Sequence, residues 1–126
     1  MSAQLKARTK AFALDVVCVC ADLPSSPEIG HIRKQLQRSA TSVAANYRAA
    51  CLGKSKPDFI AKLGIVEEEA DESAFWLELI KELHLRLNLD LQEPISRELD
   101  RLEEEACELL AITIASRKTA RGNEPD

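Results

Sequence analysis

Two carboxylates on one face of a predicted helix are the residues most suggestive of chemistry in this sequence. Glu69 and Glu72 interrupt an otherwise apolar stripe that continues to Trp76, because side chains three and four positions apart share a helix face. If that face is buried, both carboxylates need cationic or hydrogen-bonding partners. Arg38 and Arg48, on the preceding predicted helix, are the candidate cations. We expect either a polar layer, in the core or at a subunit interface, or an ordinary solvated face.

A stripe of small and polar residues lies on the same predicted helix as Arg38. It runs through Ser39, Ser42, Asn46 and Ala49. Small residues let a second helix come close, and Ser or Asn can hydrogen-bond across the gap, so the stripe predicts a tight helix contact. The complete candidate polar layer or interface consists of Arg38, Ser39, Ser42, Asn46, Arg48, Glu69, Glu72 and Trp76.

Catalytic and metal-binding patterns are incomplete. A di-metal carboxylate bundle uses two Glu-x-x-His motifs, whereas Glu28 and His31 form a single copy and His84 follows Glu82 by only two positions. The hydroxyls at positions 39–42 have no nearby histidine in the sequence, and no glycine-rich phosphate loop is present. We therefore expect no enzymatic activity, no metal and no cofactor.

The four cysteines all fall within apolar helical patterns, where a reduced cysteine acts as a small hydrophobe. Cys18 and Cys20 are two positions apart, so on a helix they point to nearly opposite faces and cannot easily share a metal ion. We expect core positions for Cys18, Cys20, Cys51 and Cys107.

Basic residues surround the second predicted helix and the loop that follows it. The candidate basic patch consists of Arg33, Lys34, Lys54, Lys56 and Lys62. Clustered cations can bind phosphates, but the isoelectric point of about 5.3 opposes strong nonspecific binding of nucleic acid. One Tyr and one Trp also offer little surface for base stacking. Binding of RNA, or of a nucleic-acid enzyme, is therefore the alternative to self-association.

Charge is divided between the two halves of the chain. Residues 1–62 carry ten Lys or Arg against four Asp or Glu, whereas residues 63–126 carry seven against seventeen, which gives +6 and −10. A folded chain can pair these charges within one subunit, present a positive face to a neighbour's negative face, or leave them solvated. The second arrangement is heterologous and can close into a ring.

Four long segments with apolar residues at alternating spacings of three and four must position these groups. Helices are predicted at residues 3–22, at 27–52, after Pro57 to 88, and after Asp90 to 116. Ser26, Ser55 and Asp90 are the predicted N-caps of the last three. The first segment has two adjacent apolar stripes, one through Phe12 and Val16 and one through Leu14 and Cys18, so we expect it to touch more than one neighbour.

The 126 residues suffice for one domain, and a composition of 45% hydrophobic but only 4% aromatic residues is typical of a helical core. We predict an all-α, antiparallel up-down four-helix bundle at residues 1–116, followed by a polar, disordered tail at 117–126. No window reaches the roughly eighteen apolar residues of a membrane span, so we expect a soluble cytoplasmic protein without membrane contact.

The motifs of the second and third helices resemble those of the bacterial four-helix-bundle family named for proteins encoded by intervening sequences in large-subunit ribosomal RNA genes. The matching residues are Arg38, Ser39, Ser42 and Asn46, then Ser55, Asp58 and Phe59, and then Glu69, Glu72, Trp76 and Leu77. The resemblance covers most of the chain. Many members have Ala-Glu-Gly soon after the Asn, whereas this chain has Arg48, Ala49 and Ala50.

This resemblance implies an antiparallel four-helix bundle assembled into a homopentameric ring, without established enzymatic activity. A relative with this architecture is the accessory subunit of a reverse transcriptase in diversity-generating retroelements. We therefore expect a homo-oligomeric interaction or scaffold protein, with an RNA-associated or polymerase-accessory role as the alternative.

Overall fold

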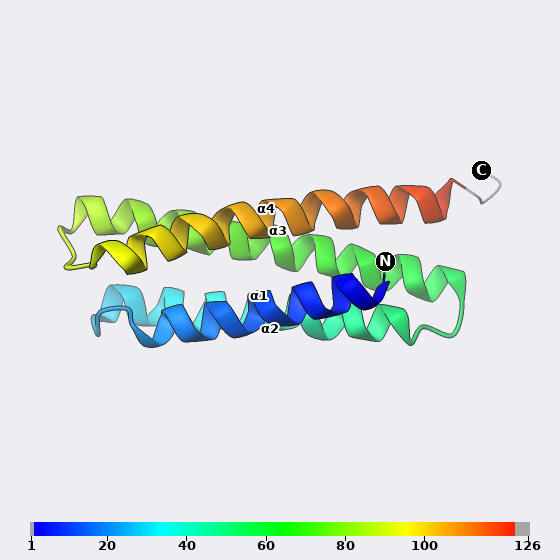
Figure 1. Ribbon diagram of the computed structural model, residues 1–126, viewed down its shortest axis with the longest axis horizontal. Helices are drawn as coiled ribbons and strands as arrows, with labels where there is room; N and C mark the ends of the chain where they lie inside the picture. Colours follow the sequence, from blue (N-terminus) through cyan, green and yellow to red (C-terminus); the bar gives the residue numbers. More distant parts are fainter. Residues whose placement is uncertain (1, 123–126) are drawn as a thin grey trace.

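Four long helices run side by side in the computed structural model, which describes residues 2–122 (Figure 1). They are α1 (Ser2–Ala21), α2 (Pro27–Cys51), α3 (Lys56–Arg86) and α4 (Glu93–Arg121). Each helix packs against the next along the chain, and α1 also packs against α4. Short loops make consecutive helices antiparallel. The all-α, up-down four-helix bundle predicted from the sequence is confirmed.

Two predicted caps set the starts of α2 and α3. The Ser26 hydroxyl accepts a hydrogen bond from the backbone N–H of Ile29 at 3.3 Å, and the Ser55 hydroxyl accepts one from Asp58 at 3.1 Å. The cap predicted at Asp90 is wrong, because α4 begins only after Gln92, whose side chain makes no capping bond. A proline in the first turn, which needs no N–H donor there, fixes this later start.

The fourth helix is longer than predicted. Residues 117–121 were expected in the tail, but α4 continues to Arg121 and the backbone N–H of Gly122 closes it on Lys118. Arg117 anchors this extension through an ion pair of 3.0 Å with Glu67 on α3. The remainder of the predicted tail, residues 123–126, lies outside the described residues.

The core forms where the apolar stripes of the four helices meet. Phe12 and Val16 of α1 are buried there against α2, α3 and α4 residues such as Leu36, Leu77 and Leu102. Four polar residues of the described chain are also buried, namely Thr9, Ser39, Ser73 and Thr113. The two threonine hydroxyls donate to carbonyls of their own helices, whereas the two serines also contact each other.

The cysteines divide between core and surface. Cys20 is buried and Cys51 is half-buried, but Cys18 and Cys107 are exposed, so the predicted core position is wrong for these two. Cys18 is exposed because it lies on the face of α1 opposite the buried Cys20. All four cysteines have free thiols.

Within residues 2–122, no helix combines the length and apolar character that spanning a bilayer requires.

Candidate functional site

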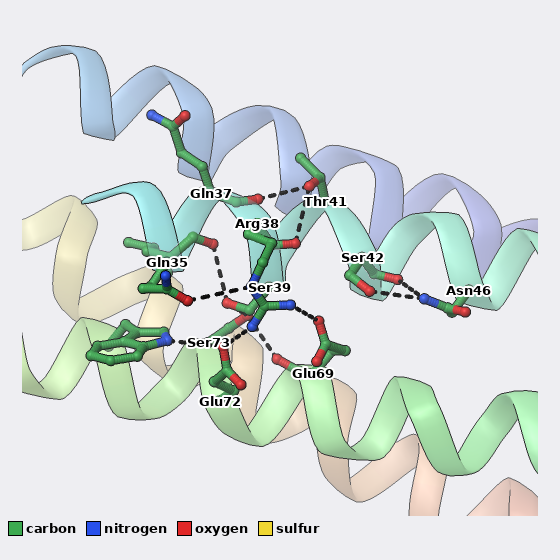
Figure 2. A network of polar contacts seen from close by, with 12 residues as sticks. Gln35, Gln37, Arg38, Ser39, Thr41, Ser42, Asn46, Glu69, Glu72 and Ser73 are labelled. Carbon is green, nitrogen blue, oxygen red and sulfur yellow. Dashed lines mark hydrogen bonds and ion pairs between the residues drawn. The ribbon is translucent and has the colours of Figure 1, made fainter. Parts of the chain in front are cut away.

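A buried serine pair joins α2 to α3 at the centre of the predicted polar layer. The hydroxyl oxygens of Ser39 and Ser73 lie 2.9 Å apart, as Figure 2 shows between the two ribbons. Each hydroxyl also has a carbonyl of its own helix within reach, Leu36 at 3.2 Å and Glu69 at 2.8 Å. Because serine is small, the two helices approach closely here and no buried hydroxyl lacks a partner.

Arg38 connects the two carboxylates that the sequence placed on one helix face. Its guanidinium donates to Glu69 at 2.9 Å and also to Glu72 (Figure 2). The indole N–H of Trp76 donates to Glu72 at 3.1 Å. Loss of hydration on its own lowers the pKa of Arg38, but the two carboxylates more than offset this and hold the pKa above its ordinary value. Arg38 therefore stays charged and balances one of the two negative charges on this part of α3.

Aromatic residues extend this layer along the α2–α3 surface. The His31 ring meets the Trp76 ring edge-on with centroids 6.2 Å apart, and Phe75 lies 5.0 Å from Trp76. Neither His31 nor Phe75 was predicted to join the layer, because the pairing of α2 with α3 cannot be read from helix periodicity. His31, the histidine of the single Glu-x-x-His motif, thus contacts an aromatic ring.

Two predicted members of the layer behave differently. Asn46 donates to the hydroxyl and the carbonyl of Ser42, so its hydrogen bonds stay within α2 instead of crossing to α3. Arg48 does not reach Glu69 or Glu72. Ten residues of α-helix rotate it by about 80° from Arg38, toward α1. Arg38 alone of the two candidate arginines therefore serves the carboxylates.

The structure does not bring the candidate basic patch together. Arg33 donates to the carbonyls of Leu23 and Pro24 at the start of α2, next to the exposed Lys34. The remaining cations lie at the far end of this helix, about 30 Å away at 1.5 Å per residue. They are the exposed Lys54 and Lys56, and Lys62, which pairs with Asp58 at 3.3 Å.

An open groove between α1 and α2 was not predicted. It has a volume of about 860 Å³ and is lined by apolar and small side chains together with three cations. Leu14 and Val17 stand in it with 57% and 41% of their surface exposed. The complete α1/α2 groove consists of Ala3, Lys6, Ala7, Lys10, Ala13, Leu14, Val17, Cys18, Thr41, Ala44, Ala45 and Arg48.

An acidic hollow of about 560 Å³ lies on α3 and α4. Four carboxylates and a single lysine line it, and Lys81 pairs with two of the carboxylates at 2.7 and 2.8 Å. Those carboxylates raise the pKa of Lys81 to about 12, so its charge is permanent at neutral pH. The acidic hollow consists of Lys81, Asp100, Glu103, Glu104, Cys107 and Glu108.

The opposite charges of the two halves pair only in part within the chain. Arg8 of α1 makes a two-pronged contact with Glu105 of α4 at 2.6 and 2.7 Å and also reaches Glu108. Its hydrogen bonds hold the pKa of Glu105 below the usual range, although burial opposes this. Among the described residues, Lys6, Lys10 and Arg48 of the α1/α2 groove have no carboxylate partner, so this positive charge remains available.

The geometry of these groups is suited to binding. Over residues 2–122, no three His, Cys, Asp or Glu side chains are grouped so that they could hold a metal ion. The serines of the polar layer are buried, and their hydroxyls contact each other and backbone carbonyls. The exposed surfaces combine apolar area with unpaired charge, which is the chemistry of a docking surface.

Comparison with known proteins agrees with this fold. A family model described as 23S rRNA-intervening sequence protein matches residues 2–112. Similarity also extends to the crystal structure of a protein of unknown function from the S23 ribosomal protein family of Bacteroides thetaiotaomicron VPI-5482, with 29% identity and a TM-score of 0.74. It covers 90% of this chain and 98% of that one. No curated protein matches the chain. The family match includes the polar layer and the α1/α2 groove.

Proposed function

This chain belongs to the 23S rRNA-intervening sequence protein family, and from that premise we propose that it is a non-enzymatic interaction protein that works as a homo-oligomer. Its proposed form is a ring of five copies in the cytoplasm. The number five rests on the resemblance of the Arg38 and Glu69 motifs to this family. The remaining support comes from the surfaces of the single chain.

The observation that carries the proposal is the open α1/α2 groove. Leu14 and Val17 stand exposed in a concave, alanine-rich surface next to Lys6, Lys10 and Arg48. A contiguous apolar surface bordered by charge favours association, because its burial removes apolar area from water while the charges select the partner. A single chain leaves this surface uncovered.

The polar layer supports the same function by fixing the shape of the bundle. Apolar stripes alone allow neighbouring helices to slide, whereas the Ser39–Ser73 contact and the Arg38 ion pairs form only in one register of α2 against α3. A fixed register holds the outer surfaces of both helices in one arrangement. Repeated copies of a chain can then assemble with uniform geometry.

Light scattering of the purified chain during size-exclusion chromatography tests this proposal. We expect a mass several times the 14.0 kDa of one chain at micromolar concentration. Association through opposite charges should weaken as salt is raised. A uniform species of 14.0 kDa throughout the peak would contradict the proposal.

Three cations of the α1/α2 groove support a second candidate, an RNA-associated or polymerase-accessory protein. Lys6, Lys10 and Arg48 line one groove whose lining contains no carboxylate, an arrangement that can contact phosphates. Titration with a structured RNA at low salt, where electrostatic binding is strongest, tests this role. Saturable binding that weakens steeply with salt would favour it, and absence of binding at low salt would exclude it.

A further inference from the structure

We propose that the α1/α2 groove of one copy receives the outer ridge of α4 from a second copy. The α4 ridge is defined here as Glu104, Cys107, Ala111, Ile114 and Ala115, all of which are exposed. Glu104, Cys107, Ala111 and Ile114 follow one another at spacings of three and four residues, and Ala115 lies four after Ala111, so they share one side of the helix. This interface rests on the homo-oligomer proposed above and specifies which surfaces it uses.

The shapes of the two surfaces are complementary. Alanines, including Ala44 and Ala45 of α2, line much of the α1/α2 groove and leave room for a helix to lie close to the backbone. The α4 ridge is narrow because two of its five members are alanines, and its large apolar side chain is Ile114, which is 44% exposed. Ile114 can therefore insert beside Leu14 and Val17, as in helix-in-groove recognition.

The charges of the two surfaces are also complementary. The lining of the α1/α2 groove carries three cations and no carboxylate, which gives +3. Four carboxylates and one lysine line the acidic hollow beside the α4 ridge, and Arg8 pairs with one of these carboxylates, Glu108, from outside the hollow, which leaves a net charge of −2. Glu104 and Cys107 belong to both the hollow and the ridge. Opposite potentials of this size guide encounter and disfavour contact between like surfaces.

The two surfaces cannot meet within one chain. α1 and α2 form one side of the bundle and α3 and α4 the other (Figure 1). The α4 ridge points away from the core, because the buried residues Leu102, Ala106 and Leu109 occupy the opposite face of that helix. The contact is therefore heterologous: each copy offers one groove and one ridge, and a closed ring uses all of them.

Two complementary variants test this interface. Leu14→Glu places a negative charge in the groove, opposite the acidic side of α4, and leaves the ridge intact, whereas Ile114→Lys places a positive charge on the ridge, opposite the three cations of the groove, and leaves the groove intact. We expect each variant alone to lose assembly at micromolar concentration, measured by light scattering. Mixed together, they should assemble again, because one intact groove meets one intact ridge and the two altered surfaces carry opposite charges.

Leu52→Glu is the matched control, since Leu52 is 72% exposed at the end of α2 and does not line the groove. It should assemble like the wild type, and circular dichroism should show that all three variants retain the helical fold. Assembly of either groove or ridge variant alone, or failure of the mixture to assemble, would overturn the interface. Normal assembly of Leu14→Glu combined with loss of RNA binding would assign the groove to nucleic acid instead. A monomeric wild type would contradict the homo-oligomer itself, so the two failures are distinguishable.

Thiol reactivity gives a second measurement on the wild type. Cys18 lies in the α1/α2 groove and Cys107 on the α4 ridge, and both are exposed in the single chain. Assembly should slow the alkylation of both thiols. The monomeric reference is Leu14→Glu for Cys107 and Ile114→Lys for Cys18, so that neither reference alters the surface around the thiol being measured. Equal rates in assembled and monomeric proteins would contradict the interface.

Discussion

The hydroxyl of Ser73 on α3 lies 2.9 Å from the hydroxyl of Ser39 on α2, and both side chains are completely buried. This pair sits beside Arg38, which bonds to Glu72, the residue before Ser73, and to Glu69, one turn earlier on α3. The buried hydroxyl contact and the charged contact between the two helices thus lie at the same level of the bundle. Together they fix the register of α2 against α3, and several measurable consequences follow.

Replacing Ser39 by a larger residue should lower the free energy of unfolding far more than deleting its hydroxyl. Ser39→Ala leaves Ser73 bonded to the carbonyl of Glu69, so we expect a loss of at most about 1 kcal/mol in the free energy of unfolding. Ser39→Leu forces extra atoms into a close helix contact and should cost about 1–3 kcal/mol. Urea unfolding at one protein concentration measures both. Lys34→Leu, on the exposed side of α2 and outside the α1/α2 groove, is the control, and equal stability of both leucine variants would refute a tight contact.

Replacing Arg38 by methionine should destabilise the fold, because Glu69, with only 14% of its side chain exposed, loses its cation. We expect a loss of about 1–3 kcal/mol, whereas Arg86→Met, at an exposed arginine of α3 outside the α1/α2 groove, should change the unfolding free energy by less than about 0.5 kcal/mol. The loss in the free energy of unfolding should be smaller when Arg38→Met is combined with Glu69→Gln. Equal effects of the two arginine substitutions would mean that the ion pairs contribute nothing to stability.

Replacing glycine by alanine should have opposite effects on stability at Gly30, within α2, and at Gly53, just after α2. No heavy atom lies within 4 Å of a Cβ built at Gly30, so Gly30→Ala should raise stability by about 0.5–1 kcal/mol through lower chain entropy. A Cβ at Gly53 would lie 2.9 Å from an oxygen of Asp58 and 3.0 Å from the carbonyl oxygen of Ala50, so Gly53→Ala should lower stability. Thermal unfolding of the two variants measures these changes. A shift of the unfolding temperature in the same direction for both variants would contradict this packing.

The ion pair between Arg8 and Glu105 should make stability depend on pH in the acidic range. Hydrogen bonds from Arg8 hold the pKa of folded Glu105 below the 4.5 of the unfolded chain. The unfolded chain therefore takes up a proton first as pH falls, and the stabilisation present above pH 4.5 disappears as pH falls through the lower folded pKa. Arg8→Met should lose about 1 kcal/mol at pH 7 and much less in strong acid. A difference between wild type and variant that is independent of pH would contradict this assignment.

Much of the fold was predictable because its signals are local. The spacing of apolar residues identified four helices, and Ser26 and Ser55 marked the starts of two of them. Asp90 failed as a cap because the proline of the first turn, and not the nearest acidic residue, decided where α4 begins. Pairing with Glu67 extended α4 through Arg117, and such a long-range contact leaves no trace in helix periodicity.

The candidate site was predictable only where residue type restricted the answer. Carboxylates on a buried stripe require a cation, so Arg38 and Arg48 were both expected, but only the packing of α2 on α3 distinguishes them. The first helix contacts both α2 and α4, as expected, but its stripe through Leu14 and Cys18 is exposed and is not buried against a second neighbour. Periodicity could not tell that Leu14 faces an open groove instead of the core, because it records which residues share a face and not what covers that face.

Native mass spectrometry of the wild-type chain tests the central claim most directly, because it counts the copies in each assembly. We predict a dominant species of about 70 kDa, five times the 14.0 kDa of one chain. A spectrum containing only the 14.0 kDa chain, under conditions in which the four helices remain folded, would contradict self-assembly as the function of this bundle.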